Sequence, residues 1–357
     1  MCGRIKVKLK KFKSGDEYVD INEVMKNLIQ GLTGNVQEDI IYLQAKLEEC
    51  KDQEGYEEIL DACVGLLLEA FPEADVLDLK ELLTSSEFGV SSVLLKASEL
   101  MYSRNYLDAR NLLEELIERI ESSNKYQDND YNEYRSFNNL IEVLLYDKTR
   151  NSTKEVHDVA EHIGEVYCLY GDVLNGLNEK EMARNAYKRG LSWNPVFTKL
   201  LLAYAATFRN PAETDRFALE TLRAFKYAYT KEELANCYCN LGDYHAQAKR
   251  WLPARACYLL GSKYEENGKE VHKRLIMAEN ETKDLELTTS RMAKLSSEYN
   301  FPLKPNGKVI ETVIGVAKHF VKEEQTDLAR YFLTLAKDLT VSEEIEKLLE
   351  KLPKAAN

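Results

Sequence analysis

The chain carries one sequence pattern twice, YCLYGDVLNGLNEKEMARNAYKRGLSWNP at residues 167–195 and YCNLGDYHAQAKRWLPARACYLLGSKY at residues 238–264. In each copy a tyrosine-rich stretch ends at a glycine. An alanine follows twelve residues later, and a tyrosine follows four residues after that alanine. A unit of this length that repeats indicates helices that stack on copies of themselves, because one such unit cannot bury its apolar face alone. The pattern therefore predicts antiparallel helix pairs.

The spacing of small residues suggests how the two helices of a pair pack. Helices approach closely only where the side chains between them are small, so Gly171 is expected to lie against Ala183. Tyr187 then fills the space beyond this crossing. Pro195 ends the first copy because proline has no N–H to continue a helix. The second copy is expected to pack in the same way.

Both copies resemble the tetratricopeptide repeat, whose signature combines bulky, small, alanine, aromatic and proline positions. The second copy departs from it in having Glu266 where the proline would stand. Weaker copies of the alanine spacing occur at three further places: Ala97 and Ala109, Ala206 and Ala218, and Ala317 and Ala329. The resemblance implies an all-α fold, a right-handed superhelical solenoid of antiparallel helix hairpins.

The charge is distributed unevenly along the chain, which has a formal net charge of −12. Only basic side chains carry charge in residues 1–13, whereas residues 14–90 are strongly acidic. We predict a basic N-terminal tail or short strand at 1–15. An acidic helical segment follows at 16–90, made either of degenerate repeats or of a separate bundle. The repeat array occupies 91–357 and ends in a capping helix whose polar outer face favours a monomer.

Helix starts are marked by capping boxes, in which a hydroxyl and a carboxylate satisfy the first backbone amides of a helix. The pattern predicts such boxes at Thr230 with Glu233, at 152–155 and at 340–343. Among the predicted helices, two occupy 129–147 and 153–175.

The composition of the chain indicates which kinds of partner and which cellular compartment to expect. A sustained basic surface is absent from the acidic body of the chain, so nucleic acid is not an expected partner. No apolar signal region and no apolar stretch of membrane-spanning length is evident. The seven cysteines form no disulfide framework and indicate free thiols. We therefore expect a cytoplasmic protein without membrane insertion.

Residues that could carry chemistry are few. Met-Cys-Gly at the start resembles families that use an N-terminal cysteine as nucleophile, but those families continue into β-rich folds. His157 and His162 are five residues apart, which on a helix separates them too far for one metal ion. We predict no catalytic residue, no metal site and no cofactor, and an enzyme that uses Cys2 is an alternative.

The resemblance implies that the first helix of each hairpin lines a concave groove. The groove residues carried over from it are Asp172, Asn175, Tyr204, Thr207, Asn236, Asn240 and Asp243, with Glu165, Cys168 and Cys239 on the same helices. Side-chain amides such as Asn236 can pair with the backbone of an extended peptide. One subtype clamps a terminal carboxylate with Lys, Asn and Arg, and this chain lacks that clamp. The acids Asp172 and Asp243 favour a basic or neutral peptide.

The predicted function is a non-enzymatic scaffold that binds a protein or peptide in this groove. The alternative is a bacterial-type regulatory protein. In that case the repeats sense a peptide, and the acidic N-terminal helices engage a protein partner.

Overall fold

The computed structural model of the protein describes residues 28–33, 36–50, 56–70, 83, 86–122, 126–159, 161–265, 268–283 and 285–353. The chain forms two compact units, Met1–Glu118 and Arg119–Asn357. The basic segment 1–15 with Cys2, and most of the predicted helices 17–30 and 74–84, lie outside the described residues.

The first unit is helical in its described part. Its helices are α2 (Val36–Glu49), α3 (Tyr56–Ala70), α5 (Ser86–Tyr102) and the larger part of α6 (Tyr106–Ser122). Helix α2 packs against both α3 and α5. On α3, Ile59, Cys63 and Leu67 recur every four residues, so they share one face, and all three are buried in the core of the unit.

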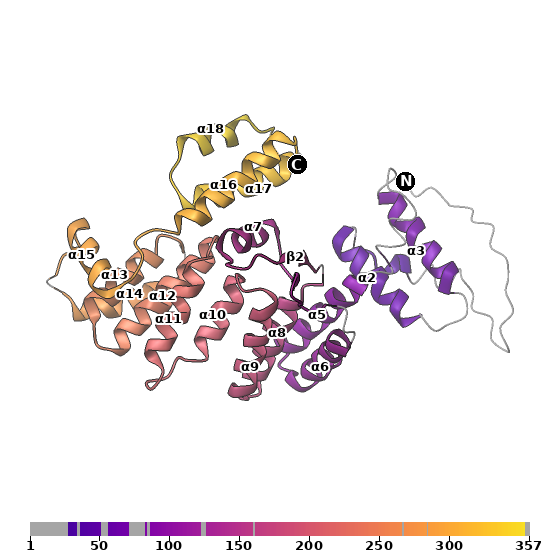
Figure 1. Ribbon diagram of the computed structural model, residues 1–357, viewed down its shortest axis with the longest axis horizontal. Coiled ribbons are helices and arrows are strands. Elements are labelled where there is room, and N and C mark those ends of the chain that lie inside the picture. The colour runs from indigo at the N-terminus through magenta and orange to yellow at the C-terminus, as the bar shows by residue number, and fades with distance from the viewer. Residues whose placement is uncertain are drawn as a thin grey trace. The chain divides into compact units, whose positions relative to one another are not determined.

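The second unit consists mainly of paired helices (Figure 1). They are α7 (Leu140–Thr149), α8 (Ile163–Gly176), α9 (Lys180–Trp193), α10 (Thr198–Ala206), α11 (Thr214–Phe225), α12 (Lys231–Gln247), α13 (Trp251–Gly261), α14 (Lys269–Glu281), α15 (Thr289–Tyr299), α16 (Gly307–Lys322), α17 (Thr326–Leu339) and α18 (Glu343–Lys351). The main hairpins are α8 with α9, α10 with α11, α12 with α13, and α16 with α17. The predicted all-α solenoid of helical hairpins is confirmed. None of the helices described is long and apolar enough to cross a membrane.

The two clear repeats share one contact at the centre of the hairpin. A methyl group on Gly171 would overlap the ring of Tyr187, and one on Gly242 would overlap the ring of Tyr258. The glycine therefore makes room for the aromatic ring. Ala183 is fully buried, and the side chain nearest to Gly171 is the ring of Tyr187, so the predicted contact between Gly171 and Ala183 stays a prediction.

One of the predicted capping boxes is present. The hydroxyl of Thr230 accepts a hydrogen bond from the N–H of Glu233 at 3.2 Å, and the Glu233 carboxylate accepts from the N–H of Thr230 at 3.0 Å. The box predicted at 152–155 is wrong because residues 155–158 form a strand. The box at 340–343 is also wrong, since residue 340 ends α17 and α18 begins three residues later.

Residues 126–159 depart from the helical pattern. Strand β1 (Asn132–Arg135), helix α7 and strand β2 (Glu155–Asp158) form a β-α-β unit in which the strands pair in parallel. The helices predicted at 129–147 and 153–175 therefore begin too early. Asn139 sets the later start of α7, because its side-chain oxygen accepts hydrogen bonds from the first free backbone amides of that helix.

Buried polar contacts anchor this β-α-β unit to the hairpins. The carboxylate of Glu142, which is 1% exposed, accepts hydrogen bonds from the N–H of Asn138 at 2.8 Å and from Asn194 Nδ2 at 2.7 Å. Burial raises the pKa of Glu142. The side chain of Asn139 donates to the hydroxyl of Tyr229 at 2.8 Å. The unit is thereby tied to the end of α9 and to the connection between α11 and α12.

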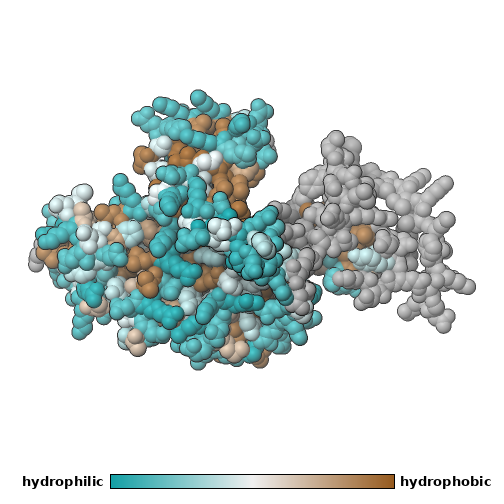
Figure 2. Space-filling model, in the orientation of Figure 1, coloured by the Kyte–Doolittle hydropathy of each residue, from teal (hydrophilic) through white to brown (hydrophobic). Residues whose placement is uncertain are grey.

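The C-terminal hairpin, α16 with α17, packs back onto α7. Lys148 of α7 donates to the hydroxyl of Thr312 at 2.8 Å, and Lys231 at the start of α12 forms an ion pair with Asp338 at 2.8 Å. Figure 2 shows apolar side chains gathered over this hairpin, with hydrophilic residues around them. Helix α18 packs on α17 through the buried Ile345, in the position of the predicted capping helix.

His245 on α12 is buried among aromatic rings. Its ring centre lies 5.5 Å from that of Tyr299 and 6.2 Å from that of Phe301. Neither ring nitrogen has a hydrogen-bond partner among the described residues. Desolvation, aided by the charge of Arg250, lowers the pKa of His245 to about 4. The folded protein therefore holds a neutral imidazole at this place.

Replacing Gly171 by alanine should destabilise the protein by about 1–3 kcal/mol, because the added methyl group must displace the Tyr187 ring from a closely packed crossing. The matched control is Gly315→Ala in α16, where nothing lies within 4 Å of the added methyl group. Alanine there should stabilise the helix by about 0.5–1 kcal/mol. Urea denaturation followed by circular dichroism measures both changes. Parent-like stability of Gly171→Ala would contradict the crossing.

The part of the free energy of unfolding that His245 contributes should fall as the pH is lowered from about 6.5 to about 4. In this window the unfolded chain binds a proton at His245 that the folded chain does not bind, so acid favours unfolding. The contribution of this group is on the order of 3 kcal/mol. Denaturant titrations at several pH values should show the parent losing stability relative to His245→Leu as the pH falls through this window. The same pH dependence in both proteins would rule out His245 as its source.

Candidate functional site

A polar stripe runs along α12 of the second unit. Asn236, Asn240, Tyr244 and Gln247 follow one another at intervals of three or four residues, so they share one face of the helix. Asn236 is exposed and makes no hydrogen bond within the described residues. Asn240 is 8% exposed. Three of the predicted groove residues therefore lie on this helix: Asn236, Asn240 and Asp243.

Arg209, from the turn between α10 and α11, joins two of these residues. Its Nη2 donates to Oδ1 of Asn240 at 2.5 Å and lies 3.6 Å from Oδ2 of Asp243. Arg274 of α14 approaches Oδ1 of Asp243 at 3.3 Å. The hydroxyl of Tyr258 donates to the same oxygen at 2.9 Å. Asp243 therefore has two cationic partners and one hydroxyl donor from its own chain.

The equivalent acid of the first clear repeat has fewer partners. Tyr187 donates to Oδ1 of Asp172 at 2.7 Å and accepts a hydrogen bond from Nδ2 of Asn175 at 2.8 Å. Burial raises the pKa of Asp172, and it raises the pKa of Tyr187 as well. These two predicted groove residues hold the hydroxyl of the tyrosine that packs their own hairpin.

The two predicted groove residues of α10 and its turn form hydrogen bonds with arginines of the neighbouring helices α9 and α11. Tyr204 is 6% exposed, and its hydroxyl accepts a hydrogen bond from Arg216 at 3.1 Å. Thr207 accepts from Nε of Arg184 at 3.2 Å and donates to the carbonyl of Tyr204 at 2.8 Å. Both residues connect α10 to neighbouring arginine side chains.

Arginine side chains are the feature that the sequence interpretation missed. The guanidinium carbons of Arg184 and Arg216 each lie 4.3 Å from the ring centre of Phe208, which is fully buried. Arg209 lies 5.0 Å from the ring centre of Phe217. These cation–π contacts join the turn between α10 and α11 to helices α9 and α11, so spacing within one helix gives no signal of them.

An open pocket of about 460 Å³ lies beside the α12 stripe. Its lining includes Arg209, Asp215, Tyr244, Gln247 and Arg250. Tyr244 donates to Asp215 at 3.0 Å, and the guanidinium carbon of Arg250 lies 5.6 Å from the centre of the Tyr244 ring. Arg250 forms no ion pair with any residue that the structure describes. The pocket therefore offers one uncommitted cation beside an aromatic ring.

The cysteines on the predicted groove helices are buried, and the two histidines considered for a metal site lie on different elements. Cys168 and Cys239 are buried, and burial raises the pKa of Cys239 to about 11. His157 lies on β2 and His162 directly precedes α8, so the assumption that both lie on one helix is wrong. Within the described residues, no group of three or more His, Cys, Asp or Glu side chains could hold a metal ion.

The solved structures that this chain resembles share little sequence with it. No protein-family model and no curated protein matches the sequence. The chain is similar to a solved structure of the APC/C hetero-tetramer Cut9–Hcn1, with a TM-score of 0.24 and 12% identity over 93% of this chain and 59% of that chain. It is also similar to the TPR domain of P58(IPK), with a TM-score of 0.19 and 13% identity over 92% of this chain and 95% of that chain. The resemblance to tetratricopeptide repeats therefore rests on the hairpins themselves.

Tyr187→Phe should destabilise the protein more than Tyr258→Phe. Without the Tyr187 hydroxyl, the carboxylate of Asp172 loses its one hydrogen-bond donor among the described residues, which costs on the order of 1–3 kcal/mol. Asp243 keeps two arginine partners when the Tyr258 hydroxyl is removed. Urea denaturation of the two variants gives the comparison directly. An equal loss of stability in both would contradict the assigned roles of the arginines.

Proposed function

We propose that the protein is a non-enzymatic scaffold that binds an extended peptide segment of a protein partner. The peptide lies along the α12 stripe and enters the pocket beside Arg209. The observation that carries this proposal is the combination of an exposed amide, Asn236, with the uncommitted guanidinium of Arg250 in a pocket on the same side of the helix.

The chemistry of these groups suggests how a peptide is held. The side-chain amide of Asn236 supplies a donor and an acceptor, which can pair with a peptide backbone whatever its sequence. Eight residues of helix separate Asn236 from Tyr244, or about 12 Å along the axis. An extended peptide of about four residues spans that length.

The arginines of the pocket determine which charge the bound peptide carries in this proposal. From the sequence, Asp243 was expected to attract a basic group, but its carboxylate is already compensated by Arg209 and Arg274. Arg250 has no such partner within the described residues and lies at the pocket rim. A carboxylate, from an acidic side chain or from the end of a chain, is the complementary group for a free guanidinium.

Of the predicted groove residues, Asn175 is exposed and extends the candidate surface to α8. The regulatory alternative requires the segment 16–90 to engage a second partner, and no contact of a described residue favours it over the scaffold. The domain limits 1–15, 16–90 and 91–357, a cytoplasmic location and a monomeric state remain proposals.

Binding of two fluorescein-labelled peptide pools tests the proposed function. Both pools contain random heptapeptides, with glutamate at the last two positions in one and lysine in the other. The parent should bind the glutamate pool more tightly in fluorescence anisotropy. Asn236→Ala and Arg250→Ala should each weaken that binding by about tenfold, since each removes one hydrogen-bonding or ionic contact.

The control for these variants is Arg223→Ala, which removes a partly exposed arginine of α11 that pairs with Glu220 at 3.5 Å. It should leave the affinity for the glutamate pool unchanged. Circular dichroism confirms that each variant is folded. Parent-like affinity of both Asn236→Ala and Arg250→Ala, or a preference for the lysine pool, would place the binding surface elsewhere.

A further inference from the structure

The backbone N–H and C=O groups of strand β2 point alternately toward β1 and away from it. The N–H of Glu155 donates to the carbonyl of Tyr131 at 2.8 Å, and that of Val159, just after the strand, donates to the carbonyl of Arg135 at 2.6 Å. Backbone groups of successive residues in a strand point to opposite sides. The odd-numbered residues of β2 therefore pair with β1, and the even-numbered residues point away from it.

The outer edge of β1 is occupied by its own chain. The N–H of Tyr134 donates to the carboxylate of Asp128 at 2.8 Å. Asn132 exchanges two hydrogen bonds with Asn129, both at 2.9 Å. The N–H of Ser136 donates to a carbonyl at the end of α9 at 3.0 Å. No further strand can add on this side of the sheet without breaking these bonds.

The outer edge of β2 has no such partners. Within the described part of the chain, neither the N–H nor the C=O of Val156 or Asp158 makes a hydrogen bond. Glu155 and Asp158 are exposed, and the two residues between them are partly exposed. An accessible sheet edge with unpaired backbone groups is a template for another strand.

We propose that β2 is a docking edge, to which an extended peptide adds as a third strand through the backbone groups of Val156 and Asp158. The peptide contains two apolar or aromatic residues flanked by two basic residues. This site is separate from the α12 stripe and does not rest on the function proposed for that stripe.

The charges beside the edge define the basic residues of the peptide. The carboxylate of Glu155 is exposed and forms no ion pair with any residue described in the structure. Asp158 uses one carboxylate oxygen to accept a hydrogen bond from the N–H of Phe137 at 3.1 Å. Opposite charges in neighbouring positions across a sheet stabilise strand pairing. Lysine or arginine is therefore the complementary residue beside both acids.

The two central residues of β2 define the apolar part of the peptide. Val156 packs against the cluster formed by Phe137 and Tyr146, so an apolar side chain beside it extends that cluster. On the other face of the sheet, the rings of Tyr134 and His157 stack with their centres 5.2 Å apart. An aromatic side chain beside His157 continues this stack.

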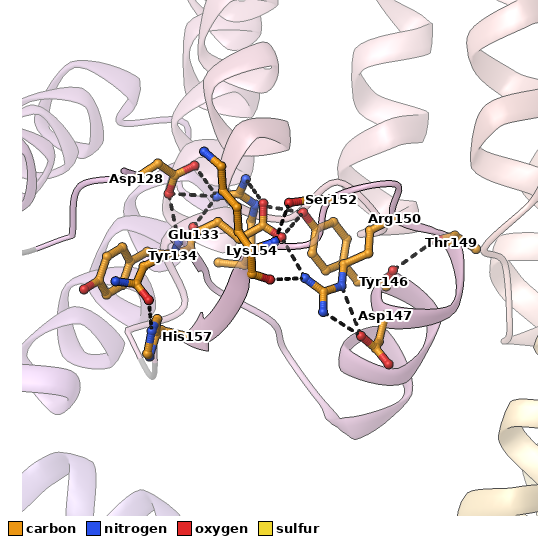
Figure 3. Close-up of polar contacts among 12 residues, drawn as sticks. Asp128, Glu133, Tyr134, Tyr146, Asp147, Thr149, Arg150, Ser152, Lys154 and His157 are labelled. Carbon is orange, nitrogen blue, oxygen red and sulfur yellow. Dashed lines mark hydrogen bonds and ion pairs between the residues drawn. The ribbon is translucent and has the colours of Figure 1, made fainter. Parts of the chain in front are cut away.

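The edge is held in shape before any peptide arrives. The carboxylate of Glu133 on β1, which is 4% exposed, accepts a hydrogen bond from the Tyr146 hydroxyl at 3.1 Å and lies 3.3 Å from Arg150 (Figure 3). Arg150 also donates to the carbonyl of Lys154, directly before β2, at 2.6 Å. These contacts join both strands and α7. A preformed edge reduces the conformational entropy that binding must overcome.

The test uses the full chain and the labelled peptide Ac-Thr-Lys-Val-Tyr-Lys-Thr-NH2 in fluorescence anisotropy. Val156→Pro removes the outward N–H, and an edge strand tolerates proline where that N–H faces solvent. It should lower the affinity for the peptide by at least about tenfold. Val156→Thr keeps the N–H and the branched side chain, so it should bind the peptide within about threefold of the parent.

A second pair of variants tests the charge without touching the backbone. Glu155→Lys should lower the affinity by about three- to tenfold, because it places a like charge beside the peptide lysine. Glu343→Lys makes the same charge change on the exposed side of α18 and should have no effect. Melting curves show that each variant is folded.

Alternate N-methylation of the peptide distinguishes strand addition from charge attraction. Methyl groups on the residues whose N–H faces β2 should abolish binding, whereas methyl groups on the other set should preserve it. Equal binding of both N-methylated peptides, parent-like binding by Val156→Pro, or no binding of the peptide to the parent would overturn the proposal. Asn236→Ala and Arg250→Ala should bind this peptide like the parent, so the two proposals fail independently.

Discussion

The contact between a glycine and a tyrosine ring at the centre of each clear hairpin is the constraint on which the array depends. Tyr187 against Gly171 and Tyr258 against Gly242 fill the crossing so completely that even a methyl group on the glycine would overlap the ring. Each buried tyrosine must also satisfy its hydroxyl, and it does so on the acid that follows the glycine. One aromatic side chain thus fixes both the distance between two helices and the position of a carboxylate.

The β-α-β unit depends on buried polar groups instead. Glu142 is almost fully buried and is tolerated because Asn138 and Asn194 donate to it. Asn139 caps α7 and at the same time reaches the hydroxyl of Tyr229. These bonds hold α7 where the C-terminal hairpin packs on it, so the last hairpin of the chain lies against a helix formed far earlier in the sequence.

Hydrogen bonds and ion pairs within the chain also occupy several side chains of the candidate site. Helical spacing places Asn236 and Asn240 four residues apart on α12, and Asn236 is exposed whereas Asn240 is buried. Spacing could not show that Asp243 is paired with arginines from a turn and from another helix, because those contacts join residues distant in sequence. Among the described residues, the side-chain amide of Asn236, the guanidinium of Arg250 and the outer edge of β2 have no hydrogen-bond or ion-pair partner, and the two proposals rest on these groups.

The amino-acid sequence by itself determined the helical hairpins, because the period of small and aromatic residues is local and each hairpin closes within one repeat. It also determined the start of α12 through the capping box at Thr230. Tertiary structure alone decided that residues 132–135 and 155–158 become strands. Each is four residues long, too short for a reliable period, and they are stable only because a distant segment supplies the other half of the sheet. It likewise decided the pairing of Asp243, since charge compensation depends on which side chains meet in space.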